Sequence, residues 1–265
     1  MPGCARKITK HRVYRVKIDI SSSNAELGRK AARRGAEILR MLAKSKNRLT
    51  LVVPTGASQI AVYEHLVREP NIPWERIDTY HLDEYVGIDA DHPGSFRRYL
   101  RERLVSKVPT LGSFEQIRGD SPDIHREIRR LNDLMLGRDI DLCFAGIGEN
   151  GHLAFNDPPA DFNTTDPYVL VKLDHACRHQ QFHEGWFERF EDVPEQAISM
   201  SVRQIMKSKY LVVSVPGKRK AKAVKAAIES AVSPQIPASI LQQHDCCDLF
   251  LDDESSCLLG TRIHG

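Results

Sequence analysis

Apolar residues are distributed along this chain in two alternating patterns. The first is a short, nearly continuous apolar run, which is typical of a strand buried on both faces of a sheet. The clearest runs are residues 49–53, 77–82, 142–147, 168–173 and 210–215. Weaker segments that predict short strands are 113–119, 197–201, 239–242 and 249–251.

The second pattern is the helical spacing, in which apolar residues return every three or four positions. It predicts helices at residues 24–44, 58–68, 95–105, 120–136 and 218–231, and a helical turn at 202–206. Ser23 or Asn24 is placed to cap the first of these helices. Strands that alternate with helices through short connections form a largely parallel sheet. The predicted fold class is therefore α/β: a three-layer, Rossmann-like, open and largely parallel sheet with helices on both faces.

No internal repeat, low-complexity tract or linker interrupts this order. We expect a single domain over residues 1–265, of which residues 1–23 form an N-terminal arm or an edge strand. The basic residues of that stretch alternate with Val13, Val16 and Ile18.

Composition narrows the class of protein. The chain has 265 residues, of which 41% are hydrophobic and 28% charged, enough for one large domain with its own core. The net charge of +3 predicts no general nucleic-acid surface. No apolar run approaches the roughly 20 residues of a membrane helix, and no signal peptide is visible. The six cysteines show no CxxC spacing, so we expect no metal site and a reducing, cytoplasmic compartment.

Polar residues gather directly after several predicted strands. They lie at Thr55–Ser58, Asp83–Glu84, Asn150–Asp157 and Lys218–Lys220. The ends of parallel strands meet at one edge of an open sheet, where such folds bind their ligands. Each loop taken singly is also explained as a helix cap or a solvated connection. Their convergence at one edge favours a functional site.

The content of these loops indicates proton-transfer chemistry on a phosphorylated small molecule. Thr55, Gly56, Ala57 and Ser58 form a small-residue turn before a helix, which offers N–H groups and hydroxyls to a phosphate. A lysine of 218–220 adds positive charge. Carboxylates and a histidine move protons when their pKa values are tuned by their surroundings. No P-loop, GxGxxG, HExxH or nucleophile-elbow pattern is present.

Three motifs resemble the glucosamine-6-phosphate deaminase family, which is related to the 6-phosphogluconolactonases. They are Pro54-Thr-Gly-Ala-Ser58, Leu82-Asp-Glu-Tyr-Val-Gly87 with His92-Pro-x-Ser95, and the glycine-rich Gly146–Pro158 segment Gly-Ile-Gly-Glu-Asn-Gly-His-Leu-Ala-Phe-Asn-Asp-Pro. The likeness covers about residues 24–252. It implies conversion of glucosamine 6-phosphate and water to fructose 6-phosphate and ammonia, as part of amino-sugar metabolism, without a metal or an organic cofactor.

The resemblance also implies roles for single residues. Asp83 is similar to the base that moves a proton from C2 to C1; its structural alternative is a helix N-cap. His152 is similar to the group that opens the sugar ring; its alternative is a core histidine. Asn150 and Asp157 are expected to orient His152. The expected substrate- and phosphate-binding residues are Thr55, Gly56, Ala57, Ser58, Glu84, Gly151, Arg178 and Lys220. Lys220 has the alternative of a solvated helix-start lysine.

The chain departs from the family pattern at several of these positions. Asn150 stands where many deaminases carry Asp, and Asp157 where they carry Glu. The family's phosphate-binding arginine has no clear equivalent, so we predict that Arg178 replaces it. The basic residues that bind the allosteric activator in some members fall near Val169 and Val171, so we expect no such regulation.

Two other functions remain open on the sequence. A 6-phosphogluconolactonase would hydrolyse a lactone of a sugar phosphate. A non-catalytic sugar-phosphate sensor would use the same fold to bind an effector. In each case the expected partner is a small sugar phosphate, not a nucleic acid or a membrane. A homo-oligomer is compatible with the sequence, which does not fix the oligomeric state.

Overall fold

The computed structural model describes residues 16–260. Its main sheet has the strand order β1-β10-β9-β6-β2-β3-β5, and every neighbouring pair is parallel. The strands are β1 (Lys17–Ser21), β2 (Leu49–Val53), β3 (Ile77–His81), β5 (Ser113–Glu115), β6 (Leu142–Ala145), β9 (Tyr210–Val215) and β10 (Cys247–Asp252). The edge strand β1 comes from the N-terminal stretch; residues 1–15 lie outside the described part.

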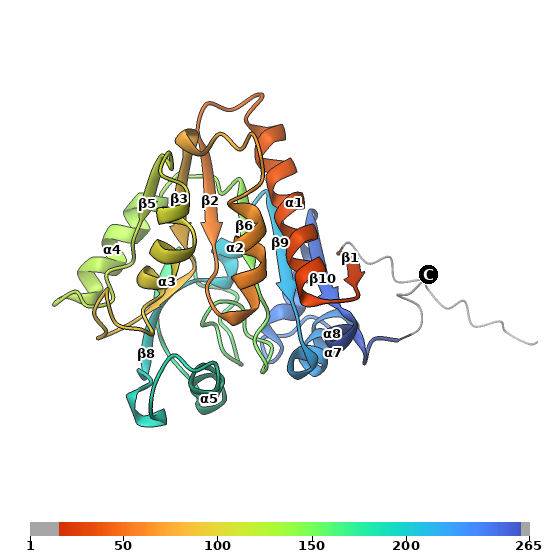
Figure 1. The fold of residues 1–265 in the computed structure, drawn as a ribbon. Helices are drawn as coiled ribbons and strands as arrows, with labels where there is room; N and C mark the ends of the chain where they lie inside the picture. Colours follow the sequence, from red (N-terminus) through yellow and green to blue (C-terminus); the bar gives the residue numbers. More distant parts are fainter. Residues whose placement is uncertain (1–15, 261–265) are drawn as a thin grey trace, which may run out of the picture.

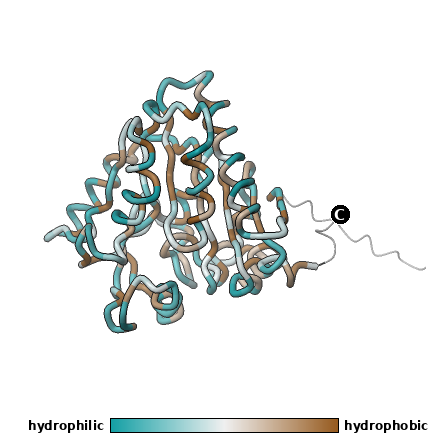
Figure 2. Tube along the Cα trace, viewed as in Figure 1, coloured by the Kyte–Doolittle hydropathy of each residue, from teal (hydrophilic) through white to brown (hydrophobic). Residues whose placement is uncertain are grey.

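Helices cover both faces of this sheet, so the predicted three-layer α/β fold is confirmed (Figure 1). On one face lie α1 (Asn24–Leu42), α2 (Ile60–Leu66) and α3 (Phe96–Arg103). On the other lie α4 (Ile124–Met135), α6 (Val202–Met206) and α7 (Ala221–Glu229). Strand residues alternate between the two layers: Leu51 and Val53 pack with the first, Val52 with the second. Figure 2 shows the apolar strands between helices with polar outer faces.

Cap residues account for several helix starts. The Ser23 side chain accepts a hydrogen bond from Glu26 N, and Asp123 likewise caps α4 by accepting from Arg126 N. The prediction that Ser23 or Asn24 caps the first helix is therefore confirmed for Ser23. Short 3-10 helices precede two others, at Ala57–Gln59 before α2 and at Lys218–Lys220 before α7. Both follow a glycine with positive φ, Gly56 and Gly217.

A second sheet departs from the predicted architecture. It has three antiparallel strands in the order β4-β8-β7: β4 (Asp83–Tyr85), β7 (Tyr168–Lys172) and β8 (Gln196–Met200). The sequence predicted one largely parallel sheet, but the strand at 168–173 lies in this second, antiparallel sheet. Its apolar content is explained by packing of Tyr168, Ile198 and Met200 against the main core. This sheet positions Asp83 just beyond the end of β3 through its pairing with Ser199.

Two further predictions are corrected. Residues 239–242 are not a strand but part of the 3-10 helix Pro237–Gln243, because Pro237 at its start favours a helical turn. The run that includes Cys177 and Gln181, to which the sequence assigned no element, is the helix α5 (His175–His183), capped by Asp174. In Figure 1, α5 lies beyond the carboxyl ends of the main strands. A last element, α8 (Asp253–Ser256), follows β10.

Within residues 16–260, no helix is long and apolar enough to cross a membrane.

Candidate active site

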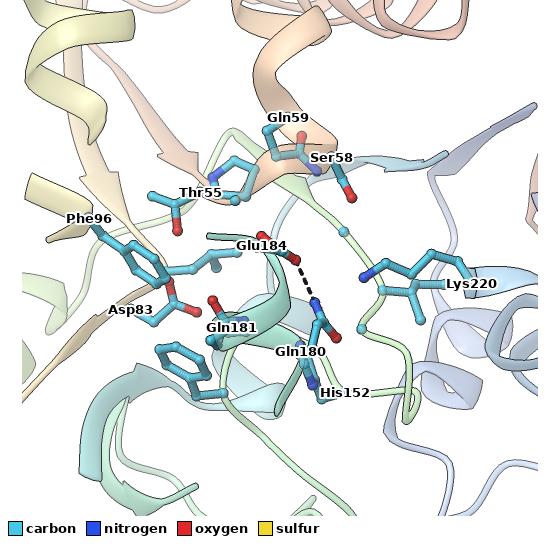
Figure 3. Close-up of a pocket in the computed structure, with 18 residues that line it drawn as sticks. Thr55, Ser58, Gln59, Asp83, Phe96, His152, Gln180, Gln181, Glu184 and Lys220 are labelled. Carbon is cyan, nitrogen blue, oxygen red and sulfur yellow. Dashed lines mark hydrogen bonds between the residues drawn. The ribbon is translucent and has the colours of Figure 1, made fainter. Parts of the chain in front are cut away.

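Four of the predicted polar loops meet at one edge of the sheet. The strands that precede them, β9, β6, β2 and β3, are neighbours in the sheet, and the order of connection reverses between β6 and β2. The pocket at this point is lined by residues of all four loops and of α5 (Figure 3). Its polar lining residues are Thr55, Ser58, Gln59, Asp83, His152, Gln180, Gln181, Glu184 and Lys220.

Asp83 is a buried carboxylate without a hydrogen-bond partner for its side chain among the described residues. It is 6% exposed and lines the pocket. Burial, and then the neighbouring charge of Glu84, raise its pKa well above the ordinary value. A buried carboxylate that no protein donor satisfies is costly, and such groups concentrate at functional sites. Its ionised form is therefore a strong base that faces the pocket (Figure 3).

Glu84, the adjacent carboxylate, does not reach the pocket, which corrects its predicted role in substrate binding. Successive residues of β4 point to opposite faces. The fully buried Glu84 accepts hydrogen bonds from Ser95 Oγ at 2.9 Å and from the backbone N–H groups of Phe96 and Arg97 at the start of α3. Arg97 also pairs with it, Nε to Oε2 at 3.3 Å. Glu84 therefore anchors α3 behind Asp83.

Arg97 is buried, unlike the neighbouring Arg98 and Arg101 of α3. Arg97 is 4% exposed, and its NH1 lies 2.8 Å from Asp120 Oδ1. Arg98 and Arg101 do lie on the surface, in ion pairs with Glu102 and Asp91.

His152 lies beside Asp157, as the sequence predicted. His152 Nδ1 is 3.2 Å from Asp157 Oδ1, a close contact in which the N–H direction is imperfectly aligned. Asn150 Nδ2 donates to the same carboxylate at 3.0 Å, and Asn150 Oδ1 accepts from His152 N at 3.0 Å. Burial raises the pKa of Asp157, but the bond and charge of His152, then Asn150 and the Asp174 N–H, outweigh it and lower that pKa. Asp157 thus stays ionised, and Nε2 of His152 has no hydrogen bond within residues 16–260.

Gly148 provides the space in which the His152 ring lies. A Cβ atom at Gly148 would be 2.2 Å from His152 Cε1 and Nε2. We expect Gly148→Ala to leave the fold intact but to displace the ring, and to lower kcat by at least about tenfold, since misplacement of a catalytic group by about 1 Å is costly. Activity and thermal melting of Gly148→Ala measure this, with Gly260→Ala, where a Cβ meets only Glu229 Oε1 at 3.5 Å, as the control. A fully active Gly148→Ala variant would show that the ring position is unimportant.

Part of the pocket lining has the features predicted for a phosphate site. Thr55, Gly56 and Ser58 line it, and Gly56 adopts φ +95°. Lys220 lines the same pocket, and its alternative as a solvated lysine is wrong because it is 7% exposed. Burial lowers its pKa, partly opposed by the charges of Glu184 and Glu149. Its ammonium has no hydrogen bond or ion pair with another residue of the described part.

Besides Glu84, the predicted binding residues Gly151 and Arg178 lie outside the pocket lining. The Arg178 guanidinium donates to Val193 O at 2.7 Å and stacks over Phe190, so Arg178 does not replace the missing phosphate-binding arginine. Gly151 adopts φ +89° in the turn before His152, outside the pocket lining. Ala57 contributes its backbone N–H, which already donates to Glu184 Oε2 at 3.1 Å.

Sequence reasoning missed the contribution of α5. Gln181 Oε1 accepts from Tyr85 OH at 2.8 Å, and Gln180 Oε1 accepts from Glu149 N at 2.9 Å. These bonds fix α5 over the pocket, where Gln180, Gln181 and Glu184 line it. The spacing of these three polar residues, on one face of a helix, was the available signal.

One group of side chains in this region has the spacing of a metal site. Ligand atoms of His152, Asp157 and Cys177 lie within 4.8 Å of one another. Burial raises the pKa of Cys177 well above its ordinary value, so the thiol is held neutral, which disfavours metal binding. Both Asp157 oxygens also accept hydrogen bonds, from Asn150 Nδ2 and Asp174 N. The group fits an oriented histidine better than an ion.

Residues 22–249 match the model of the glucosamine-6-phosphate isomerases/6-phosphogluconolactonase family, and this chain belongs to that family. The resemblance that the sequence indicated is therefore confirmed.

Particular relatives are deaminases. The glucosamine-6-phosphate deaminases of Bacillus thuringiensis (strain Al Hakam) and Bacillus cereus (strain AH820) are each 32% identical over 232 residues, which are 88% of this chain and 86% of theirs. A monomeric glucosamine-6-phosphate deaminase of known structure is 31% identical, with a TM-score of 0.81 over 91% of this chain and 99% of its own. The 6-phosphogluconolactonase of Trypanosoma brucei shares the fold, at 16% identity and TM-score 0.77 over 94% of this chain and 100% of its own.

Proposed function

We propose that this protein is a glucosamine-6-phosphate deaminase, which converts glucosamine 6-phosphate and water to fructose 6-phosphate and ammonia. The observation that carries the proposal is Asp83, a buried and unpaired carboxylate that shares a pocket with His152 and Lys220. The deaminases at 32% and 31% identity support the same substrate.

In the proposed reaction, His152 opens the sugar ring by donating a proton from Nε2 to the ring oxygen. The bond from C1 to the ring oxygen breaks, and the C1 hydroxyl loses its proton to solvent as the aldehyde forms. The ionised Asp157, 3.2 Å from Nδ1, stabilises the imidazolium that makes this donation possible. Asn150 holds Asp157 and the His152 backbone N–H together, and so fixes the ring's orientation.

Asp83 then acts on the open-chain sugar. Its carboxylate accepts the proton from C2, so the C2–H bond breaks, and returns a proton to C1, so a C1–H bond forms. The amine gives up one N–H proton and the C1 oxygen gains one, so the product is the isomeric imine at C2 with a hydroxyl at C1. Water converts this imine to the ketone with release of ammonia. The raised pKa of Asp83 suits it to hold the proton between the two steps. Thr55, Ser58 and Lys220 would bind the 6-phosphate.

A 6-phosphogluconolactonase is the second candidate, favoured by the fold shared with the Trypanosoma brucei enzyme. Hydrolysis of a lactone breaks no C–H bond, so it gives the unpaired Asp83 no substrate proton to move from carbon.

Reaction in deuterium oxide separates the two enzymes. We expect the purified protein to release ammonia from glucosamine 6-phosphate and to introduce deuterium at C2 of recovered substrate or at C1 of the product. Mass spectrometry and an ammonia assay measure both. Hydrolysis of 6-phosphogluconolactone without deamination would establish the lactonase, and binding without any turnover would favour a sensor.

A further inference from the structure

The turn predicted to bind the phosphate, Thr55–Ser58, already holds a carboxylate, the side chain of Glu184. Its Oε2 accepts from Ala57 N at 3.1 Å, the N–H that opens the 3-10 helix after Gly56. A Cβ at Gly56 would be 3.4 Å from the same oxygen, so the carboxylate packs directly on the turn. The side chain therefore occupies the position where the turn would receive an anion.

Other contacts hold the Glu184 carboxylate in place. Trp186 Nε1 donates to Oε2 at 3.2 Å. Gln180 Nε2 donates to Oε1 at 2.9 Å, the bond drawn in Figure 3. Trp186 in turn packs edge-on against Tyr99, whose hydroxyl donates to Gly56 O at 2.9 Å. The position of the carboxylate thus follows from α5 and from the turn together.

The carboxylate of Glu184 and the ammonium of Lys220 offset each other's charge in this part of the pocket. Lys220 is buried and has no hydrogen bond or ion pair among residues 16–260, and Glu184 is the carboxylate that acts most strongly on it. No arginine of this described part lines the pocket. A phosphate brings a charge of about −1.5 to −2 at neutral pH. Beside Glu184 it meets a like charge at short range, which weakens its binding.

We infer that Glu184 is a specificity-determining residue that competes with the anionic group of the substrate for Ala57 N–H and Lys220. A phosphorylated ligand binds only as this carboxylate leaves the turn, so Glu184 sets how strongly the pocket prefers phosphorylated over unphosphorylated sugars. The inference rests on the proposed function for the substrate class, but competition for the anion position does not depend on turnover.

Binding of inorganic phosphate, measured by calorimetry, tests the inference directly. We expect Glu184→Gln, which removes the charge and keeps the shape, to bind phosphate at least about tenfold more tightly than the wild type. Glu184→Ala, which also removes the hydrogen bonds, is expected to do the same. The matched control is Glu188→Gln, a change of equal charge at an exposed position outside the pocket, with binding within twofold of wild type. Unchanged or weaker phosphate binding by both Glu184 variants overturns the inference.

Kinetics supply a second readout. In Glu184→Gln we expect the KM for glucosamine 6-phosphate to fall while kcat changes little. Loss of the carboxylate strengthens binding of the phosphate equally in the substrate and in the transition state. A raised KM would mean that Glu184 assists substrate binding, and would overturn the inference. If no variant deaminates glucosamine 6-phosphate but Glu184→Gln still binds phosphate more tightly, the proposed function fails and this inference stands. If the wild type deaminates glucosamine 6-phosphate but the Glu184 variants bind phosphate no more tightly, the proposed function stands and this inference fails.

Discussion

Asp83→Asn is expected to lower kcat for deamination by at least about 10²–10⁴-fold, the range that general base catalysis contributes. Asn keeps the size of the side chain but accepts no proton, so both the loss of the C2 proton and its return to C1 fail. Deuterium incorporation from solvent should be lost with ammonia release. We expect the KM to change less than kcat, because Asp83 transfers the proton and does not bind the phosphate.

The same substitution is expected to stabilise the folded protein. Burial raises the pKa of Asp83, so the folded state holds its proton more tightly than the unfolded state does. The burial of its charge therefore costs stability above the unfolded pKa of about 3.9, and the cost is complete once the pH exceeds the folded pKa. Asp83→Asn removes that cost. The rise in melting temperature should be largest at high pH and should shrink as the pH falls.

Asp133→Asn is the matched control for this variant, because Asp133 is exposed on α4 and has no role in the pocket. It should alter neither activity nor melting temperature. Deamination that survives in Asp83→Asn would exclude Asp83 as the base. A melting temperature that falls at neutral pH would show that the carboxylate is stabilised in the folded protein after all.

His152→Gln is expected to lower kcat for deamination of the cyclic substrate by about 10²–10⁴-fold, since the ring oxygen loses its proton donor. Gln is similar in size and polar, but its amide has no proton to give at neutral pH. His125→Gln, a change at an exposed position of α4, is the control and should be fully active.

An acyclic ketose separates ring opening from a general loss of structure. 5-Deoxyfructose 6-phosphate lacks the hydroxyl that closes the ring, so exchange of its C1 proton in the presence of ammonium needs Asp83 but not His152. We expect His152→Gln to retain this exchange within about tenfold of wild type, and Asp83→Asn to lose it. Equal loss of both activities in His152→Gln would contradict the ring-opening role.

The relation between sequence and site is clearest at Asp83 and Glu84. Both carboxylates were predicted to contact the substrate, because both directly follow a strand. The structure brings only Asp83 to the pocket, since β4 is itself a strand and alternates its side chains between two faces. The three residues of β4 have little apolar character, so the sequence pattern alone does not predict a strand there. Pairing with β8, more than a hundred residues further along the chain, creates it.

Arg178 and Glu184 show a second kind of limit. Arg178 was predicted to bind the phosphate in place of the family's arginine. In the structure, α5 turns Arg178 toward Val193 and presents Glu184 to the pocket. Helix α5 has little apolar periodicity, so its orientation follows from contacts with distant residues such as Tyr85 and Glu149. Those contacts exist only once the sheet has assembled.

The sequence by itself determined the parallel α/β core and the edge at which Thr55, His152, Asp157 and Lys220 meet. Apolar runs and helical spacing are local patterns, and the ends of parallel strands gather at one edge wherever such a sheet forms. Only the tertiary structure decided that Asp83 is buried without a partner and that Glu184 occupies the anion position. Both depend on burial and on contacts between segments far apart in the chain, which no local pattern records.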